Sequence, residues 1–273
     1  MSIINTNMSS LNAQRNLSKS SNELSTSMQR LSSGLRVNSA KDDAAGLSIA
    51  TKMDSQVRGM SQASRNANDG ISMIQTADGA LSNISDALQR MRELSVQAAN
   101  GTNGTDEVDN IKTELTALNT EIGRIAKDTK FNGKDLLTAA GTKAAIQVGA
   151  DKDQSIEVSI GSNTKYAGLV AADIDVSDSA KAGATIAKLD EALGALNTER
   201  ASLGTAQNRM GYAISNLATS IENQSAAKSR IMDTDYAAET SKLSRSQVLQ
   251  QAGTAMLAQA NSAPNSVMSL LRG

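Results

Sequence analysis

Residues 68–100 read NDGISMIQTADGALSNISDALQRMRELSVQAAN, and this stretch decides the fold. Ile74, Leu81 and Leu88 recur every seven residues within it, and a second apolar row runs three or four residues out of phase. This is the a/d pattern of a helix that buries one narrow stripe against other helices. The opening Asn-Asp-Gly predicts a turn and cap before the helix, and the closing Asn, followed by Gly101, predicts its end.

Two further segments continue the pattern. Residues 107–128 space their aliphatic side chains four and three apart, and residues 186–217 hold spacings of seven. With a short loop at 100–105, the 107–128 helix should pack antiparallel to the helix at 71–99. The predicted bundle core comprises Ile74, Leu81, Ile84, Leu88, Met91, Ile111, Leu115, Leu118, Ile122, Leu189, Leu196, Leu203 and Met210.

The pattern of apolar residues changes in the middle of the chain. Residues 144–149 and 155–161 alternate apolar and polar side chains around a turn at 151–153, which predicts a small β-hairpin. Residues 131–134 predict a turn, and residues 162–180 carry no regular pattern. The predicted fold class is therefore mainly α: a long antiparallel helical bundle or coiled coil with a small β-hairpin region.

The two ends carry weaker heptads, at residues 3–35 and 233–259, among many Asn, Ser, Gln and Thr residues. One interpretation is frayed or disordered ends, and the other is segments that become helical when partner helices cover their stripe. Gly34 should end the first helix in the left-handed conformation, and Pro264 should open a short final helix. The predicted inner-core assembly residues are Leu17, Leu24, Met28, Leu31, Leu249, Met256, Leu270 and Leu271.

The helix boundaries suggest four parts. Asp42 and Asp43 should supply an N-cap and a first-turn acid for a helix that follows them. Residues 1–42 then form an N-terminal inner-core helix, and residues 43–180 form the N-terminal part of an outer-core domain that includes the hairpin. Residues 181–232 form the C-terminal helix of that domain, and residues 233–273 form a C-terminal inner-core helix.

The composition excludes most catalytic chemistry. The 273 residues include no His, Cys or Trp, and aromatic residues make up only 1%. An imidazole base, a histidine metal ligand and a thiol nucleophile are therefore impossible, and no phosphate-binding or dinucleotide motif occurs. Asp42-Asp43 and Asp233-Asp235 are better interpreted as caps and solvated faces than as acid–base pairs. We expect a non-enzyme without cofactor or metal. A structural protein is therefore favoured over an enzyme and over a free-standing binding module.

The net charge and the N-terminus bear on which partners and which cellular location the sequence predicts. A formal charge of −1 gives no bulk attraction to nucleic acid or to an anionic membrane. The N-terminus lacks the basic and apolar regions of a cleaved signal peptide, and no apolar run is long enough to span a bilayer. These rules alone predict a soluble cytoplasmic protein, a prediction that fails for proteins exported without a cleaved signal.

Six blocks of sequence resemble bacterial flagellin. They are LSSGLRVNSAKDDAAGLSIA (31–50), NDGISMIQTADGAL (68–81), LQRMRELSVQAAN (88–100), KFNGKDLL (130–137), ERASLGTAQNRM (199–210) and AMLAQANSAPNSVMSLLR (255–272). The resemblance covers roughly residues 1–137 and 186–273, in the order and at the ends expected of that family. The short middle is similar to a minimal flagellin that lacks large outer domains.

This resemblance implies a structural subunit that polymerises into the helical flagellar filament for swimming motility. It implies type III export without a cleaved signal peptide and an extracellular location in the flagellum. The main partner it implies is the protein itself, in a helical homopolymer. An export chaperone, the filament cap and hook–filament junction proteins are implied as further partners, without nucleic acid or membrane insertion. The alternative is a hook–filament junction protein, which has flagellin-like ends.

The family resemblance also implies a host-receptor surface. In flagellins recognised by Toll-like receptor 5, the motif that matches LQRMRELSVQ supplies the main contact ridge. Carried over residue by residue, the contacts are Gln89, Arg90, Leu94 and Glu114. The competing interpretation gives these side chains to contacts between subunits in the filament, and the two are compatible.

Overall fold

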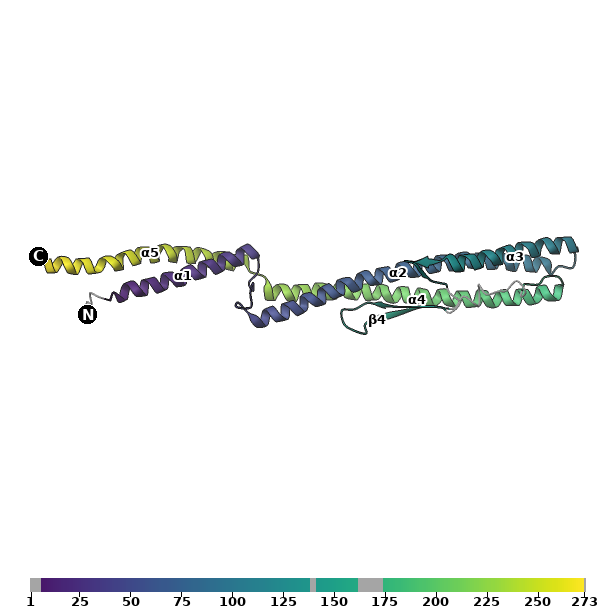
Figure 1. The fold of residues 1–273 in the computed structure, drawn as a ribbon, viewed down its shortest axis with the longest axis horizontal. Coiled ribbons are helices and arrows are strands. Elements are labelled where there is room, and N and C mark those ends of the chain that lie inside the picture. Colours follow the sequence, from purple (N-terminus) through teal and green to yellow (C-terminus); the bar gives the residue numbers. More distant parts are fainter. Residues whose placement is uncertain (1–5, 138–140, 162–173, 273) are drawn as a thin grey trace. The chain divides into compact units, whose positions relative to one another are not determined.

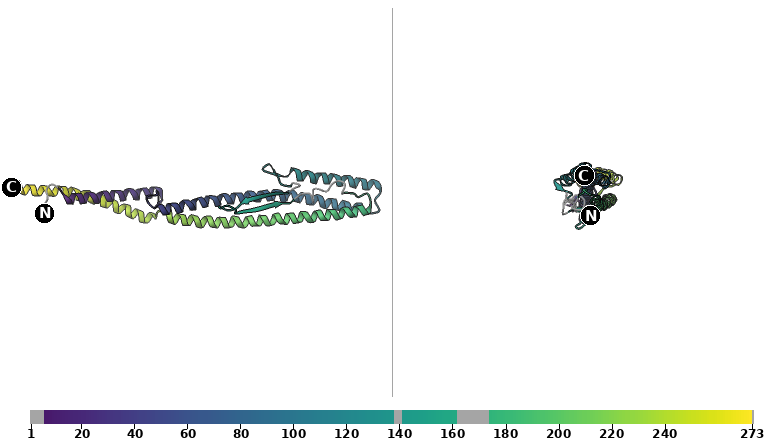
Figure 2. Two further views of the ribbon diagram at one scale, coloured as in Figure 1. Left: turned by 60° about the horizontal axis from the view of Figure 1, so that its bottom comes forward. Right: turned by 90° about the vertical axis from the view of Figure 1, so that its right-hand side faces the viewer.

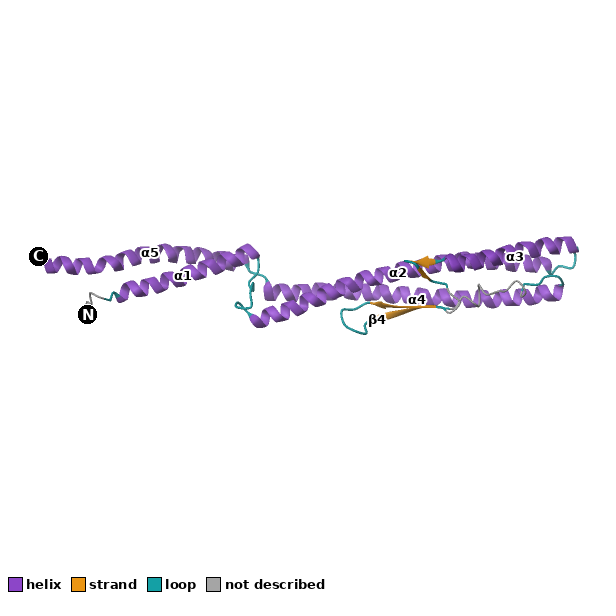
Figure 3. Cartoon of the chain, viewed as in Figure 1, coloured by secondary structure: helices purple, strands orange, loops and turns teal. Residues whose placement is uncertain are grey.

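The computed structural model describes residues 6–137, 141–161 and 174–272, with side chains placed as far as residue 262. Within these ranges the chain forms five helices and two small hairpins (Figures 1 and 3). The elements are α1 (Met8–Ser33), α2 (Ala44–Ala98), α3 (Thr105–Asp128), β1 (Lys130–Phe131), β2 (Lys134–Asp135), β3 (Thr142–Gln147), β4 (Ser155–Ile160), α4 (Ser179–Met232) and α5 (Tyr236–Arg272). The predicted fold class, mainly α with a small β-hairpin region, is confirmed.

The chain divides into two compact units. The first comprises Met1–Ser55 and Asn223–Gly273, and the second comprises Gln56–Glu222. We call them the terminal unit and the central unit. Both divisions fall inside a continuous helix, one in α2 and one in α4.

The core of the central unit lies between α2, α3, α4 and the β3–β4 hairpin. Figure 2 shows α4 running beside α2, and α3 returns antiparallel along α2 after the loop that follows Ala98. The positions predicted for the bundle core are buried in this cluster, except that Leu118 is half-buried against its edge. β4 adds Ile156, Val158 and Ile160 from its alternate positions, because successive side chains of a strand face opposite sides.

The hairpins follow local turn chemistry. β3 and β4 pair antiparallel from Thr142 opposite Ile160 to Gln147 opposite Ser155, which confirms the predicted hairpin. The turn predicted at 131–134 joins the two-residue strands β1 and β2, which the sequence did not predict. Asn132 and Gly133 both have positive φ, 49° and 77°, as the tight turns of two-residue hairpin loops require.

One predicted boundary in the central unit is wrong. The Asn-Asp-Gly at 68–70 does not cap a new helix, because α2 continues through it. The Asn68 side chain donates to the Ser64 carbonyl at 2.8 Å within the same helix. Gly70 is buried, and a Cβ added to it would lie 2.9 Å from the Sδ and Cε atoms of Met210. The glycine therefore permits close approach of α4, and this packing outweighs the local turn preference.

In the terminal unit, α1 and α5 pack against each other antiparallel (Figure 1). α1 ends as predicted at Gly34, which has φ 72° and donates its N–H to the Arg30 carbonyl at 2.8 Å. The connector after Gly34 forms a β-bridge between Leu35 and Asp233, so the segments that lead into α2 and α5 are joined. Both ends are thus helical within a single chain.

Two further expectations about the terminal unit need correction. Asp43 is the residue that caps α2, because it accepts the Gly46 N–H at 2.8 Å. Asp42 lies before the helix, where it accepts bonds from the backbone N–H groups of Asn38 and Ser39. Pro264 does not open a separate helix, since α5 continues through it to Arg272.

The close approach at Gly70 can be tested with a matched pair of substitutions. Gly79 lies in the same helix with no atom within 4 Å of an added Cβ. Gly79→Ala should stabilise the fold by up to about 1 kcal/mol, because alanine favours helix over glycine. Gly70→Ala gains the same propensity but must displace the buried Met210 side chain. Thermal unfolding followed by circular dichroism should place Gly70→Ala below Gly79→Ala, and equal melting temperatures would contradict the packing argument.

Candidate functional site

The seam between α1 and α5 buries polar side chains. Its buried residues are Ser20 and Ser27 of α1 and Glu239 and Ser246 of α5. Each pair is seven residues apart, so both helices present small or polar side chains at one repeating position. The sequence pattern predicted apolar assembly residues such as Leu17 and Leu24 on this helix. The signal that this prediction missed is the serine three residues after each of these leucines.

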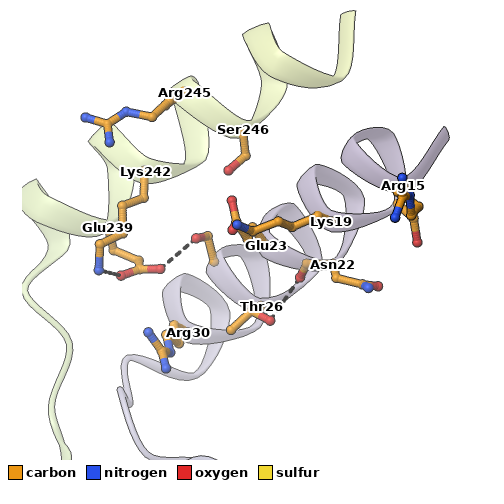
Figure 4. A pocket seen from close by; sticks show the side chains of 12 residues that line it. Arg15, Lys19, Asn22, Glu23, Thr26, Arg30, Glu239, Lys242, Arg245 and Ser246 are labelled. Carbon is orange, nitrogen blue, oxygen red and sulfur yellow. Dashed lines mark hydrogen bonds and ion pairs between the residues drawn. The ribbon is translucent and has the colours of Figure 1, made fainter. Parts of the chain in front are cut away.

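Glu239 is the charged residue at the centre of this seam, and only 4% of it is exposed. It accepts a hydrogen bond from the Ser27 hydroxyl at 2.6 Å and one from Lys242 Nζ at 3.2 Å (Figure 4). Burial is the largest single influence on the pKa of Glu239 and opposes its charged form. The bonds from Ser27 and Lys242 together outweigh burial, so the pKa lies below its ordinary value.

A groove of about 700 Å³ opens beside Glu239, between the two helices (Figure 4). Its cationic lining residues are Arg15, Lys19, Arg30, Lys242 and Arg245. Within the described ranges, all of these except Lys242 lack an ion-pair partner, and Nε of Arg30 is buried without a hydrogen bond. Its acidic lining residues are Glu23 and Glu239, so the groove carries more positive than negative charge, which suits contact with acidic groups.

The apolar side chains predicted for assembly lie beside the seam and remain partly uncovered. Leu17, Leu24 and Leu31 are half-buried. Met28 and Met256 are about two-thirds exposed, at 58% and 65%, and Leu249 is exposed as well. A second groove, of about 580 Å³, brings Leu17, Leu249 and Met256 together. The side chains of Leu270 and Leu271 lie outside the described residues.

The residues predicted for receptor contact lie on α2 and α3 of the central unit. Arg90 Nε and Nη2 donate to Glu114 Oε1 at 3.1 and 3.0 Å, which joins the two helices. These bonds to Glu114 raise the pKa of Arg90 above its ordinary value. Gln89 is exposed beside them. Leu94 is not part of this surface, because it is 2% exposed and packs into the core.

Other charged residues on α2 serve the fold itself. Arg92 donates to Asp190 of α4 at 2.6 Å, and Asp78 accepts from Arg200 of α4 at 2.7 Å. The structure uses Arg92 to link α2 to α4 within one chain.

The described side chains include no group of three or more His, Cys, Asp or Glu residues that could hold a metal ion. Across the described helices, no segment combines the length and apolarity that crossing a bilayer demands. Helical pairs with polar seams and uncovered apolar stripes are surfaces for packing against other helices. These features define a structural subunit built from helical bundles.

Comparison with known proteins identifies the family. The bacterial flagellin N-terminal helical region matches residues 4–144, and the bacterial flagellin C-terminal helical region matches residues 186–271. The flagellar filament 33 kDa core protein of Treponema phagedenis is 43% identical over 286 aligned residues, which cover 99% of this chain and all of that relative. A flagellin of Halalkalibacterium halodurans is 45% identical over 273 aligned residues, with the same coverage.

A solved structure agrees with this assignment. The crystal structure of Bacillus cereus flagellin is similar, with a TM-score of 0.50 and 34% identity, over 56% of this chain and 88% of that one. The chain belongs to the bacterial flagellin family. It is a non-enzymatic structural subunit of the flagellar filament that polymerises with copies of itself, and its short middle makes it a minimal flagellin without large outer domains.

Glu239 should make the stability of the α1–α5 seam depend on pH. A carboxylate whose folded pKa lies below its ordinary value of 4.5 contributes stability above that pH, and the contribution disappears as the pH falls through the folded pKa. Glu239→Gln keeps the shape and an acceptor for Ser27 but cannot titrate. Between about pH 5 and pH 3, melting temperatures of wild-type filaments should fall more steeply than those of the variant. Glu23→Gln, in the same groove, is the control, and parallel profiles for wild type and Glu239→Gln would contradict the assignment.

Proposed function

We propose that the paired helices α1 and α5 are the surface through which subunits join in the filament. The observation that carries the proposal is the arrangement of side chains along this pair. The seam within one chain is filled by serines and Glu239, while larger apolar residues such as Met28, Leu249 and Met256 stay uncovered. Neighbouring subunits would cover these stripes. Full burial of a side chain of this size contributes about 1.5–3 kcal/mol.

We keep the four parts expected from the sequence in this proposal, although the compact units divide after Ser55 and after Glu222. Residues 1–42 and 233–273 are the inner-core segments, and residues 43–180 and 181–232 form the outer-core domain. The bundle-core residues of the central unit support the outer layer, and the terminal helices provide the contacts at the centre of the filament. The unpaired cations of the groove beside Glu239 are available to acidic groups of a neighbouring copy.

Family membership supports a route and a set of partners for the subunit. The proposed route is type III export without a cleaved signal peptide, which places the subunit outside the cell. The proposed partners are an export chaperone, the filament cap and hook–filament junction proteins. The alternative role, a junction protein itself, predicts short assemblies, whereas a filament subunit predicts long uniform filaments after seeding, as electron microscopy would show.

Removal of the terminal helices tests the assembly surface. A chain that lacks residues 1–33 and 236–273 keeps the buried core of the central unit and should stay soluble, with the circular dichroism of a helical bundle. It should fail to elongate filament seeds, because it has lost the uncovered stripes. Sedimentation after seeding measures the outcome. Normal elongation by this folded, shortened chain would refute the role given to α1 and α5.

We also propose that the ridge formed by Gln89, Arg90 and Glu114 is a contact surface for host Toll-like receptor 5. The proposal is supported by the exposure of all three residues and by their proximity across α2 and α3. Leu94 contributes to this surface only by holding the helix in the core.

Arg90→Ala should weaken receptor activation by purified monomer about 10- to 100-fold, which corresponds to the loss of one or two charge-assisted contacts. The helix should remain folded, because an exposed ion pair such as Arg90–Glu114 contributes only about 0–1 kcal/mol. Arg124→Ala is a matched control, since Arg124 is an exposed, ion-paired arginine elsewhere on α3. A cell reporter assay measures activation, and equal potency of the two variants would refute the contact.

A further inference from the structure

Asn7 occupies an unusual position at the start of α1. Its Oδ1 accepts the Ser10 N–H at 3.1 Å, as an N-cap residue does. Its Nδ2 points the other way and donates to the backbone carbonyl of Ala260 in α5 at 2.7 Å. One side chain thus caps its own helix and bonds to the middle of the partner helix.

The Ala260 carbonyl needs such a donor because of the sequence of α5. In an α-helix each carbonyl accepts from the N–H four residues later. The residue four positions after Ala260 is Pro264, which has no N–H, and α5 continues as a helix through it. The helix therefore leaves the Ala260 carbonyl without its backbone partner, and the amide of Asn7 takes that place.

We propose that Asn7 is a positioning residue that sets the register of α1 against α5 by bonding the carbonyl freed by Pro264. A second bond supports the same alignment, from the Ser10 hydroxyl to Asn261 Oδ1 at 2.7 Å. Near the other end of α1, Ser27 bonds to Glu239 in a compatible antiparallel alignment. The half-buried leucines lie between these two polar points.

Register needs such a device because the apolar contacts repeat. Leu17, Leu24 and Leu31 are spaced by seven, and the α5 positions 239, 246, 253 and 260 repeat with the same spacing, the last three being Ser, Gly and Ala. A slip of α5 by one heptad would keep this spacing and would place Ser246 or Ala260 where Gly253 now meets Leu17, at a contact where an added Cβ lies 3.2 Å from Leu17 Cδ1. A polar group with a single available partner removes this degeneracy, as buried polar residues do in coiled coils. Pro264 is the single proline of the chain. Within the described part of α5, the Ala260 carbonyl is therefore the one that loses its helical partner to a proline.

The test compares full-length variants in filament elongation, and it rests on the proposed role of α1 and α5 in assembly. Asn7→Ser keeps an N-cap oxygen but is too short to reach Ala260. Loss of one hydrogen bond per subunit should raise the critical concentration for elongation from wild-type seeds about fivefold. Gln14→Ser is the control, because Gln14 is an exposed amide of α1 that lies outside both grooves and whose side chain bonds to no other described residue. An unchanged critical concentration for Asn7→Ser would overturn the inference.

A double-mutant cycle separates the bond to Ala260 from a general effect on α1. Pro264→Ala restores the N–H that satisfies the Ala260 carbonyl, and Pro264→Ser serves if that variant elongates poorly. In either background Asn7→Ser should change the critical concentration less than twofold. An undiminished fivefold penalty would show that Asn7 acts without Pro264 and would overturn the inference.

A third variant does not depend on Pro264. Asn7→Asp is an N-cap at least as good as asparagine, but it replaces the donor with a carboxylate that faces the Ala260 carbonyl. It should elongate worse than Asn7→Ser, and equal or better elongation would count against the cross-helix bond. If the chain without residues 1–33 and 236–273 elongates, the proposed function fails. If that chain does not elongate while Asn7→Ser behaves as wild type, only the role of Asn7 fails.

Discussion

The structure depends on one constraint: each long helix has a single narrow apolar stripe, and that stripe must be covered along its length. Helices with two apolar positions in seven bury too little alone to offset the entropy of ordering. In the central unit, α2, α3, α4 and the β3–β4 hairpin cover one another, and residues such as Leu81, Leu88 and Leu115 are completely buried. In the terminal unit α1 has α5 as its main partner, so part of each stripe remains uncovered.

The charged residues of the central unit and of the terminal unit also differ in how they are paired. In the central unit, arginines 90, 92, 124 and 200 are each held by a carboxylate, most often from a neighbouring helix. Exposed pairs of this kind contribute little to stability but favour one arrangement of the helices. In the terminal unit the cations of the groove beside Glu239 are largely unpaired. These cations and the uncovered methionines suit the terminal unit to association with other copies.

Heptad spacing predicted the helices, apolar/polar alternation predicted the hairpin, and the short loop at 100–105 predicted the antiparallel return of α3, because each depends on a local segment of sequence. Such predictions failed where packing between distant segments overrules a local signal. Asn68 and Gly70 form a turn motif by composition, yet Met210 needs the space that Gly70 leaves. The family resemblance placed Leu94 among the receptor contacts, but Leu94 is buried in the core cluster of the central unit. The small seam residues were overlooked because serine is not counted as a core residue, although Ser20 and Ser27 keep the period of seven.

The polar groups of the α1–α5 seam explain how two helices of one subunit can pair weakly and still keep one alignment. A fully apolar seam would bind more tightly within one chain, but it would also tolerate slipped registers and mismatched partners. Glu239 with Ser27, and Asn7 with Ala260, each contribute only about 1–3 kcal/mol net, since each replaces bonds that water would supply. What they provide is a single alignment of the two helices. The larger apolar side chains are then held in fixed positions on the outside, and their burial free energy is left for contacts with neighbouring subunits.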